Sequence, residues 1–148
     1  MPMIQLAAPS GALTAEGREN VQSELAAVLL RWEGAPDTFF RAQAWSYLHE
    51  LPAGAQVTAE DSADNAAPPF RVDVTVPQGA VSDRRKAGLV KDATETVLRA
   101  AGLTDADALR VWVLIHEQAE GTWGAGGGIV RYSELVALAQ KARETAGA

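Results

Sequence analysis

The chain repeats itself with an offset of 68 residues. Three segments of the first half return in the second: PSGALT (9–14) as PQGAVS (77–82), LLRWEG (29–34) as VLRAAG (97–102) and, after the loss of one residue, WSYLHE (45–50) as WVLIHE (112–117). Both the spacing and the residue types agree between the copies. We therefore interpret the chain as a tandem duplication of one structural unit, which restricts the fold to architectures built from two similar halves.

Each copy opens with the pattern of a short strand. Apolar residues alternate with other residues over positions 4–8 and again over positions 72–76, as in a strand with one buried face. A Pro-x-Gly turn follows in both copies. Thr14 and Ser82 then occupy the position where a hydroxyl side chain can accept a hydrogen bond from the first turn of a helix.

A helix and a second strand complete each copy. The helices are indicated by apolar stripes of period 3.6: Val21, Leu25, Val28, Leu29 and Trp32 in the first copy, and Leu89, Ala93, Thr96, Val97 and Ala100 in the second. Gly34 and Gly102 are typical of helix ends. Second strands are predicted over roughly residues 42–49 and 109–116. The latter is nearly continuously apolar, which is typical of a strand covered on both faces.

These elements predict an α/β (α+β) fold of tandem β-α-β units, with a four-stranded mixed sheet and two helices on one face. We expect a single domain over residues 1–148, divided into a first repeat (1–54), a linker (55–69), a second repeat (70–128) and a C-terminal extension with a helix (129–148). A small sheet with one bare face and exposed edges also predicts oligomerisation.

Composition narrows the class of protein. The absence of cysteine excludes disulfides and thiolate metal sites, and His49 and His116 at the ends of two strands do not form a metal site by themselves. A net charge of -6 with scattered basic residues argues against a nucleic-acid partner. No apolar run is long enough to span a membrane, and the amino terminus lacks the features of a signal peptide. We therefore expect a cytoplasmic protein with no cofactor and no membrane partner.

One segment has a specific resemblance. Residues 115–127, IHEQAEGTWGAGG, resemble the strand end and hairpin of the tautomerase superfamily, and Pro2 directly after Met1 resembles its N-terminal catalytic proline. The repeats are similar to fused proteins related to 4-oxalocrotonate tautomerase. The resemblance implies a tautomerase/macrophage-migration-inhibitory-factor-like fold, a homotrimer and a small-molecule substrate. It also implies a pocket around Pro2 that is partly lined by a neighbouring subunit.

The chemistry implied for Pro2 depends on a free amino terminus. An N-terminal proline is a secondary amine with an ordinary pKa near ~8, which burial and a nearby cation would lower toward working pH. Such a base can move a proton between oxygen and carbon, which is keto–enol isomerisation. If Met1 is retained, Pro2 is an amide without a basic lone pair. Pro69 begins the second copy as an amide, so each chain has at most one such base.

The positions expected to support Pro2 differ from the family pattern. The family has an arginine in the turn before the helix, but residues 12–13 and 80–81 are Ala-Leu and Ala-Val. Trp112 replaces a second arginine of the family. Arg110 lies two residues earlier on the same face of the strand, and Arg71 is a further candidate for binding substrate. The missing turn arginine favours a monoacid or a neutral enol over a dicarboxylate.

The tryptophans have two interpretations. Trp123 matches the aromatic residue that forms a wall of the family's pocket, so Trp123 and Trp112 are candidate substrate-binding residues. Trp45 and Trp112 recur by duplication, which favours packing in the core or on the sheet. Two alternatives to a tautomerase remain: a related proline-dependent dehalogenase, hydratase or decarboxylase, and a non-catalytic trimeric binding protein of the same fold.

Overall fold

Four strands form one mixed sheet in the computed structural model, which describes residues 2–34, 38–59 and 67–146. In chain order the elements are β1 (Met3–Pro9), α1 (Ala15–Glu33), α2 (Thr38–Arg41), β2 (Trp45–Leu51), β3 (Phe70–Pro77), α3 (Asp83–Ala100), the 3-10 helix η1 (Asp105–Arg110), β4 (Val111–Gln118), β5 (Gly124–Ala125), β6 (Gly128–Ile129) and α4 (Tyr132–Ala146). The sheet order is β2-β1-β3-β4. Strands within a repeat are parallel and the central pair β1–β3 is antiparallel, which confirms the predicted mixed sheet.

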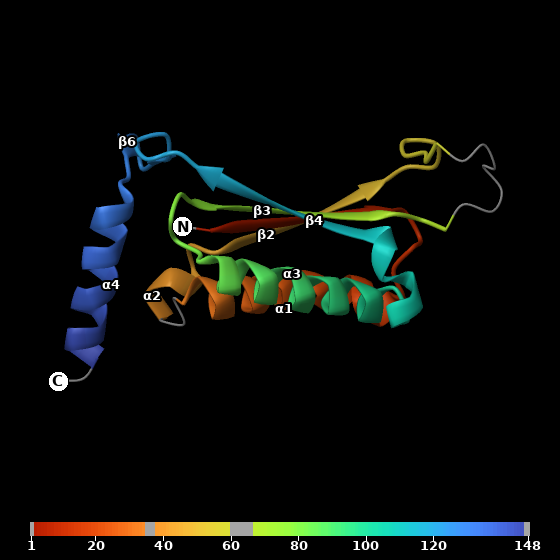
Figure 1. The fold of residues 1–148 in the computed structure, drawn as a ribbon, viewed down its shortest axis with the longest axis horizontal. Helices are drawn as coiled ribbons and strands as arrows, with labels where there is room; N and C mark the ends of the chain where they lie inside the picture. The colour runs from red at the N-terminus through yellow and green to blue at the C-terminus, as the bar shows by residue number, and fades with distance from the viewer. Residues whose placement is uncertain (1, 35–37, 60–66, 147–148) are drawn as a thin grey trace.

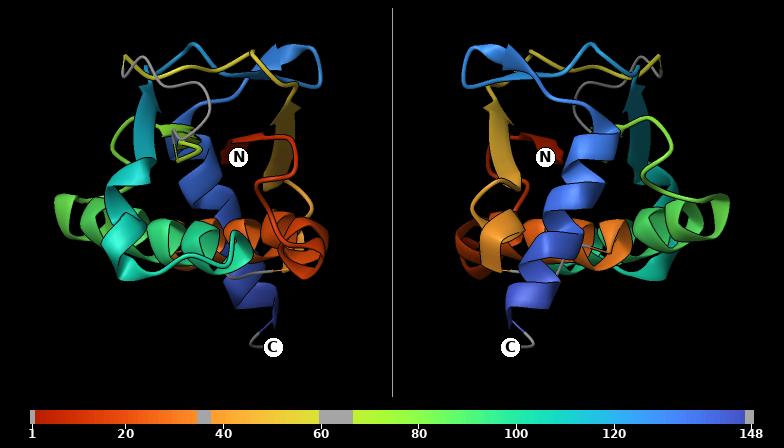
Figure 2. Two further views of the ribbon diagram at one scale, coloured as in Figure 1. Left: turned by 90° about the vertical axis from the view of Figure 1, so that its right-hand side faces the viewer. Right: turned by 90° about the vertical axis from the view of Figure 1, so that its left-hand side faces the viewer.

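The molecule has two layers and one protruding helix. Helices α1 and α3 lie side by side on one face of the sheet, and the opposite face is bare in the single chain (Figure 1). Helix α4 stands apart at one end of the layers and crosses in front of the end of α1 and the start of α3 (Figure 2, right). Within the described residues, no helix has both the length and the apolar character needed to cross a bilayer.

The predicted helix boundaries are confirmed by their caps. Thr14 Oγ1 accepts a hydrogen bond of 2.9 Å from the Gly17 amide, and Ser82 Oγ accepts one of 3.4 Å from the Arg85 amide. Gly34 ends α1 in the left-handed conformation, with a φ of 79°, which a residue without a Cβ adopts at low energy. The cap of α3 is Ala101, one residue before the left-handed Gly102.

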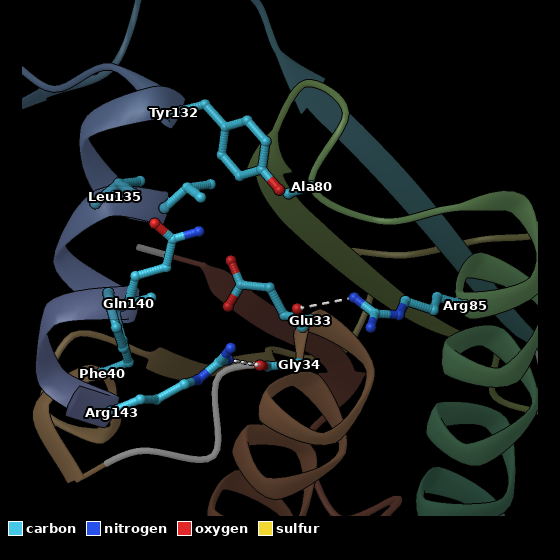
Figure 3. A pocket seen from close by; sticks show the side chains of 11 residues that line it. Glu33, Gly34, Phe40, Ala80, Arg85, Tyr132, Leu135, Gln140 and Arg143 are labelled. Carbon is cyan, nitrogen blue, oxygen red and sulfur yellow. Dashed lines mark hydrogen bonds between the residues drawn. The ribbon is translucent and has the colours of Figure 1, made fainter. Parts of the chain in front are cut away.

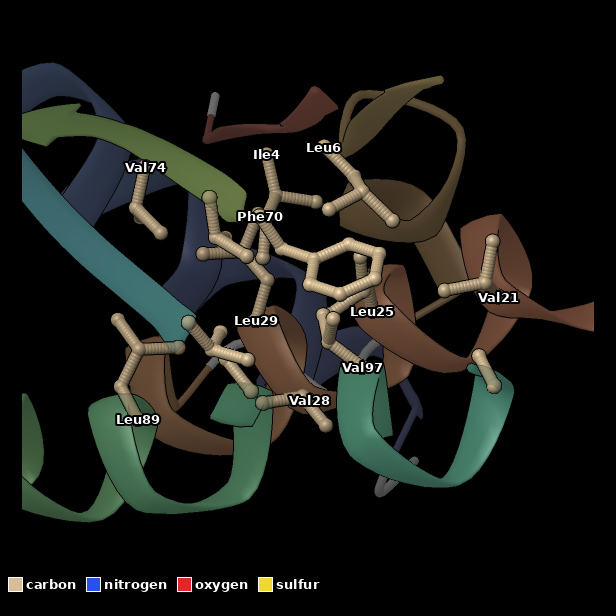
Figure 4. Close-up of a cluster of buried hydrophobic side chains, with 14 of the residues drawn as sticks. Ile4, Leu6, Val21, Leu25, Val28, Leu29, Phe70, Val74, Leu89 and Val97 are labelled. Atoms are coloured by element: carbon tan, nitrogen blue, oxygen red, sulfur yellow. The ribbon is translucent and has the colours of Figure 1, made fainter. Parts of the chain in front are cut away.

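The core lies between the sheet and the two long helices. Except for the half-buried Trp32, all residues of the two predicted stripes are buried. Phe70, the largest fully buried side chain, begins β3 and lies among residues from the strands and from both helices (Figure 4). The 68-residue offset places Phe70 at the position that Pro2 has in the first repeat. Pro2 is also buried, so one end of each repeat begins inside the core.

The duplication extends to the ion pairs that join helix to strand. Arg18 of α1 binds Glu50 at the end of β2 with an N–O distance of 2.6 Å, and Lys86 of α3 binds Glu117 at the end of β4 at 2.9 Å. Hydrogen bonds from Lys86 and the Gly79 amide lower the pKa of Glu117. These carboxylates are therefore structural in both repeats.

Helices α1 and α3 run antiparallel, so the start of each lies against the end of the other. At one end the contact is tight: the Thr14 amide and hydroxyl both donate to the Ala100 carbonyl oxygen, at 3.0 and 3.2 Å. A Cβ added to Gly17 would lie 1.9 Å from the same oxygen. The helices approach this closely only because residue 17 has no side chain.

The predicted second strands begin too early. The observed strands start at Trp45 and Val111, and each is preceded by a short helix, α2 or η1, that the sequence analysis did not predict. Apolar residues of these short helices, such as the buried Phe40, lengthen the apolar run ahead of each strand. Periodicity alone cannot separate one helical turn from the start of a strand.

The predicted environment of β4 and of the repeated tryptophans is wrong for the single chain. Strand β4 is an edge strand covered by helices on one face only, and Trp112 is 68% exposed. Trp45 is 56% exposed on the same bare face. The sequence pattern shows that these side chains are apolar, but it does not distinguish burial in the chain from burial in an assembly. Residues 60–66 of the predicted linker and Met1 lie outside the described residues.

Candidate active site

Pro2 lies at the start of β1, between the ends of two neighbouring strands. Its carbonyl oxygen accepts a hydrogen bond of 3.2 Å from the Trp45 amide at the start of β2. The next residue, Met3, pairs with Trp45 on one side and with Thr75, near the end of β3, on the other. Segments that enter β2 and leave β3 therefore form the surroundings of the Pro2 nitrogen.

A cavity of about 260 Å³ opens at this end of the molecule. It lies between the end of α1, the start of α3 and helix α4, and its wall includes Phe40, before β2, and Ala80, after β3 (Figure 3). These two residues belong to the segments that flank Pro2. The cavity is therefore the candidate active site within one chain, and α4 covers one side of it.

Two arginines that the sequence analysis did not identify line this cavity. Arg85, in the first turn of α3, donates from Nη1 to the Glu33 carbonyl oxygen at 3.3 Å. Arg143 of α4 donates from Nη2 to the Gly34 carbonyl oxygen at 3.2 Å. Both guanidinium groups reach the C-terminal carbonyls of α1 (Figure 3), where cations are favoured by the helix dipole. Arg85 has five N–H donors, so its contact with one carbonyl leaves donors for an anionic ligand.

Glu33 adds a carboxylate to the same cavity. Its side chain points from the last turn of α1 toward Gln140 of α4 (Figure 3). Burial raises the pKa of the Glu33 carboxyl, and the positive charge of the chain's amino terminus partly opposes this effect. The site therefore combines an anionic group, two cationic groups and apolar walls at the end of the molecule where β1 begins, although Pro2 itself is not among the residues that line it.

Three predicted substrate-binding residues lie at the opposite end of the sheet. Arg71 pairs in register with Ala7 of β1 and with Trp112 of β4. Ala7 is four residues along the strand from Met3, or about 13 Å. Arg110 lies beside them, where it donates to the Pro68 carbonyl oxygen at 3.2 Å and binds an Asp107 carboxylate oxygen at 2.9 Å. A single chain does not bring these residues to its own Pro2.

Trp123 lies closer to the predicted place. It follows β4, whose last residue Gln118 pairs with Pro77 at the Pro2 end of the sheet. Its carbonyl oxygen accepts a hydrogen bond of 2.9 Å from the Val130 amide, which closes the β5–β6 hairpin. The half-buried Trp123 does not line the cavity beside Glu33, so its predicted role as a pocket wall stays a prediction.

The bare face of the sheet has a polar network of its own. Arg71 donates to Asp73 at 2.7 Å, and His116 Nε2 lies 2.8 Å from the other oxygen of the same carboxylate. His49 Nε2 lies 3.0 Å from the side-chain oxygen of Gln5. Among the residues that the structure describes, no three His, Asp or Glu side chains gather as a metal site. The histidines therefore belong to the sheet face and not to the cavity.

Comparison with known proteins shows which family model the second repeat matches and which solved structures share the fold. Residues 69–131 match the family model described as Tautomerase enzyme. The solved structure of Pt0534 inactivated by 2-oxo-3-pentynoate has a TM-score of 0.72 at 21% identity, covering 90% of this chain and 98% of that one. A fused 4-OT wild-type symmetric trimer has a TM-score of 0.70 at 19% identity, covering 86% and 94%. A search of curated proteins finds no match.

Two further structures show the breadth of the fold. A member of the cis-3-chloroacrylic acid dehalogenase family has a TM-score of 0.69 at 16% identity, covering 96% of this chain and 99% of that one. Macrophage migration inhibitory factor of Toxoplasma gondii has a TM-score of 0.66 at 11% identity, covering 86% and 99%. The fold is the tautomerase and macrophage-migration-inhibitory-factor fold, as predicted. The second repeat matches the tautomerase family model, and the whole chain has the fold of the fused, two-repeat 4-OT structures.

Proposed function

We propose that the mature chain is a keto–enol tautomerase that uses the amine of Pro2 as its general base. The observation that carries this proposal is the cavity at the end of the molecule where β1 begins, which combines the Arg85 and Arg143 guanidinium groups with apolar walls. The proposed substrate is a small enol or 2-keto acid. We also propose that the protein acts in the cytoplasm.

The proposed reaction is an internal proton transfer. The Pro2 nitrogen takes the proton of the enol hydroxyl, the oxygen becomes a carbonyl, and the carbon–carbon double bond accepts the proton back from the ammonium. No atom is gained or lost. Negative charge develops on the substrate between the two steps, and a nearby guanidinium stabilises that charge in a site shielded from water.

The cavity supports a small monoacid as the substrate class. Its volume of about 260 Å³ holds a molecule of few heavy atoms, and Arg85 presents a planar pair of donors that matches one carboxylate. Arg85 thereby replaces, from the first turn of α3, the turn arginine that positions 80–81 lack. A dicarboxylate would also have to approach the Glu33 carboxylate, which is unfavourable.

Ketonisation of phenylenolpyruvate tests the proposed function. Intact-mass measurement first establishes that Met1 has been removed, and ultraviolet absorbance then follows the loss of the enol. We expect catalysis by the mature chain. If insertion of a glycine between Met1 and Pro2, which makes the Pro2 nitrogen an amide, leaves the rate unchanged, Pro2 is not the base and the proposal fails.

Arg85 is expected to bind the substrate carboxylate. The substitution Arg85→Gln removes a charge-assisted hydrogen bond, so we expect kcat/KM to fall roughly 10–100-fold, mainly through a higher KM. Arg84 provides the matched control because it is the preceding residue of α3 and is exposed outside the cavity. Steady-state kinetics measure both variants. A larger loss of kcat/KM for Arg84→Gln than for Arg85→Gln would contradict the assignment.

We further propose that the active form is a homotrimer. The bare sheet face carries Trp45, Tyr47, Trp112 and Leu114, each at least 40% exposed, and several similar fused 4-OT structures are described as trimers. Three of the predicted residues lie at the far end of the sheet, so in such an assembly they would approach Pro2 only from another subunit: Arg71, Arg110 and Trp112.

Charge introduced on the bare face is expected to prevent assembly. The substitution Trp112→Glu places an ionised group where apolar surface is buried, so we expect a shift to monomer in light-scattering mass. Leu109→Glu is the control, because Leu109 is 92% exposed on η1 and not on the sheet face. An unchanged mass for Trp112→Glu would exclude this face as the interface.

A second candidate function is addition of water by a dehalogenase or hydratase of the same superfamily. It is favoured by Glu33, a carboxylate able to activate water, in one cavity with two arginines. Halide release from a 3-chloroacrylate isomer, measured by ion chromatography, would support it. Retention of Met1 in the natural protein would instead favour the non-catalytic binding protein.

A further inference from the structure

We infer that Glu33 is a positioning residue for the Pro2 proton: its carboxylate pairs with the Pro2 ammonium and stabilises it between the two proton transfers. This inference rests on the proposed function, because it gives Glu33 a role only if Pro2 is a free amine. No catalytic contact between Glu33 and the substrate is required.

The position of Glu33 is the first observation. Its carboxylate is the one acidic group among the residues that line the described cavity, and it points into the cavity and not toward bulk solvent (Figure 3). The cavity wall at Phe40 and Ala80 belongs to the segments on either side of Pro2. Pro2 lies at the start of β1 between those segments, with its carbonyl oxygen 3.2 Å from the Trp45 amide nitrogen.

The duplication supplies a second, independent observation. The two ends of the α1–α3 pair are related by the 68-residue offset, which aligns Glu33 with Ala101 and Arg85 with Gly17. At the end with Phe70 in place of Pro2, small residues let the helices close tightly around the Ala100 carbonyl. At the end with Pro2, the same positions carry a carboxylate and a guanidinium, and a cavity opens. Glu33 and Arg85 therefore lie at the end of the helix pair where the first repeat begins, and only that repeat can present a free amine.

The other charged and titratable groups around the cavity also affect the protonation of the Pro2 amine. Arg85 of α3 and Arg143 of α4 are cations, and the Tyr132 hydroxyl of α4 points toward Ala80 (Figure 3). Two cations without a neighbouring anion would strongly disfavour protonation of Pro2. Glu33 offsets this effect, so that the amine can both accept the enol proton and hold it until carbon is protonated.

Titration of the Pro2 amine tests the inference without any substrate. Mature protein labelled with [15N]proline has one amine nitrogen among its prolines, and its chemical shift can be followed with pH. Glu33→Gln removes the charge and keeps the shape, so we expect the pKa of Pro2 to fall by about one unit, a tenfold change. Glu33→Asp, which keeps the charge, should recover most of the wild-type value.

Glu19→Gln is the matched control, the same substitution at an exposed position of the same helix. The inference is overturned if Glu33→Gln shifts the titration no more than Glu19→Gln does. If the titration shifts but no variant catalyses ketonisation, the electrostatic pairing holds and the proposed function fails. If the pairing and the proposed function are both correct, the acidic limb of the pH profile of kcat/KM should shift by the same amount as the pKa of Pro2.

Unfolding as a function of pH shows that the variant is folded and gives a second readout. Because the folded-state pKa of Glu33 is raised, its contribution to stability is complete below the unfolded pKa and is lost as pH rises through the folded value. We therefore expect Glu33→Gln to be more stable than wild type at neutral pH, with the difference disappearing in acid.

Discussion

A chain in which Pro2 remains an amide is expected to lose ketonisation activity by roughly 10²–10⁴-fold, the contribution typical of a general base. Insertion of one glycine between Met1 and Pro2 produces this state, because removal of Met1 then leaves a Gly-Pro peptide bond. An amide nitrogen has no basic lone pair. The rest of the chain, including Arg85 and Glu33, is unchanged in composition.

Pro2→Ala distinguishes the contribution of a free amine from that of the proline ring. After loss of Met1 this variant still has a basic, primary amine, so we expect a smaller loss of kcat/KM than for the glycine insertion. Equal activity of the inserted chain and the mature chain would show that the Pro2 amine takes no part. Intact mass and circular dichroism establish processing and folding for each protein before the assay.

Gly17→Ala is expected to lower the free energy of unfolding by about 2–3 kcal/mol, although alanine is intrinsically favoured in a helix by about 1 kcal/mol. The added Cβ would lie 1.9 Å from the Ala100 oxygen, which already accepts two hydrogen bonds from Thr14. Backbone cannot rotate away as a side chain can. The start of α1 must therefore separate from the end of α3.

Gly88→Ala is the comparison variant for this prediction. A Cβ at Gly88 would meet the Trp32 ring at 2.2 Å, but a ring can move at the expense of its hydrogen bond to Asp92. We expect a smaller loss of stability than for Gly17→Ala. Denaturant unfolding at one protein concentration measures the free energy of unfolding of both variants. A larger loss for Gly88→Ala than for Gly17→Ala would show that the close helix contact at Gly17 is not the stronger constraint.

Most of the fold could be predicted because its determinants are local or periodic. The hydroxyl caps at Thr14 and Ser82, the glycine at position 34 and the apolar stripes each depend on neighbouring residues. The repeat then supplied the tertiary arrangement, since two β-α-β units make one sheet. The short helices α2 and η1 were missed because their apolar residues continue the strand pattern.

The site was less accessible from the sequence. Arg85, Arg143 and Glu33 come from three helices, and only the packing of those helices places them in one cavity. Arg110 and Arg71 have the right residue type, but the register of β1 with β3 puts them at the far end of the sheet. A comparison of the copies contained one usable signal, since the 68-residue offset aligns Gly17 with Arg85 and Glu33 with Ala101.

The unequal ends of the helix pair imply a division of labour under selection. Once two units are fused, the second loses its free terminus, and its end of the molecule is released from any requirement for chemistry. Small residues there maximise contact between the helices and supply stability. The other end retains charged groups in a cavity, which lowers stability and, under the proposed function, provides reactivity. Because each end is built from both repeats, fusion allows one end of the helix pair to specialise in stability and the other in chemistry.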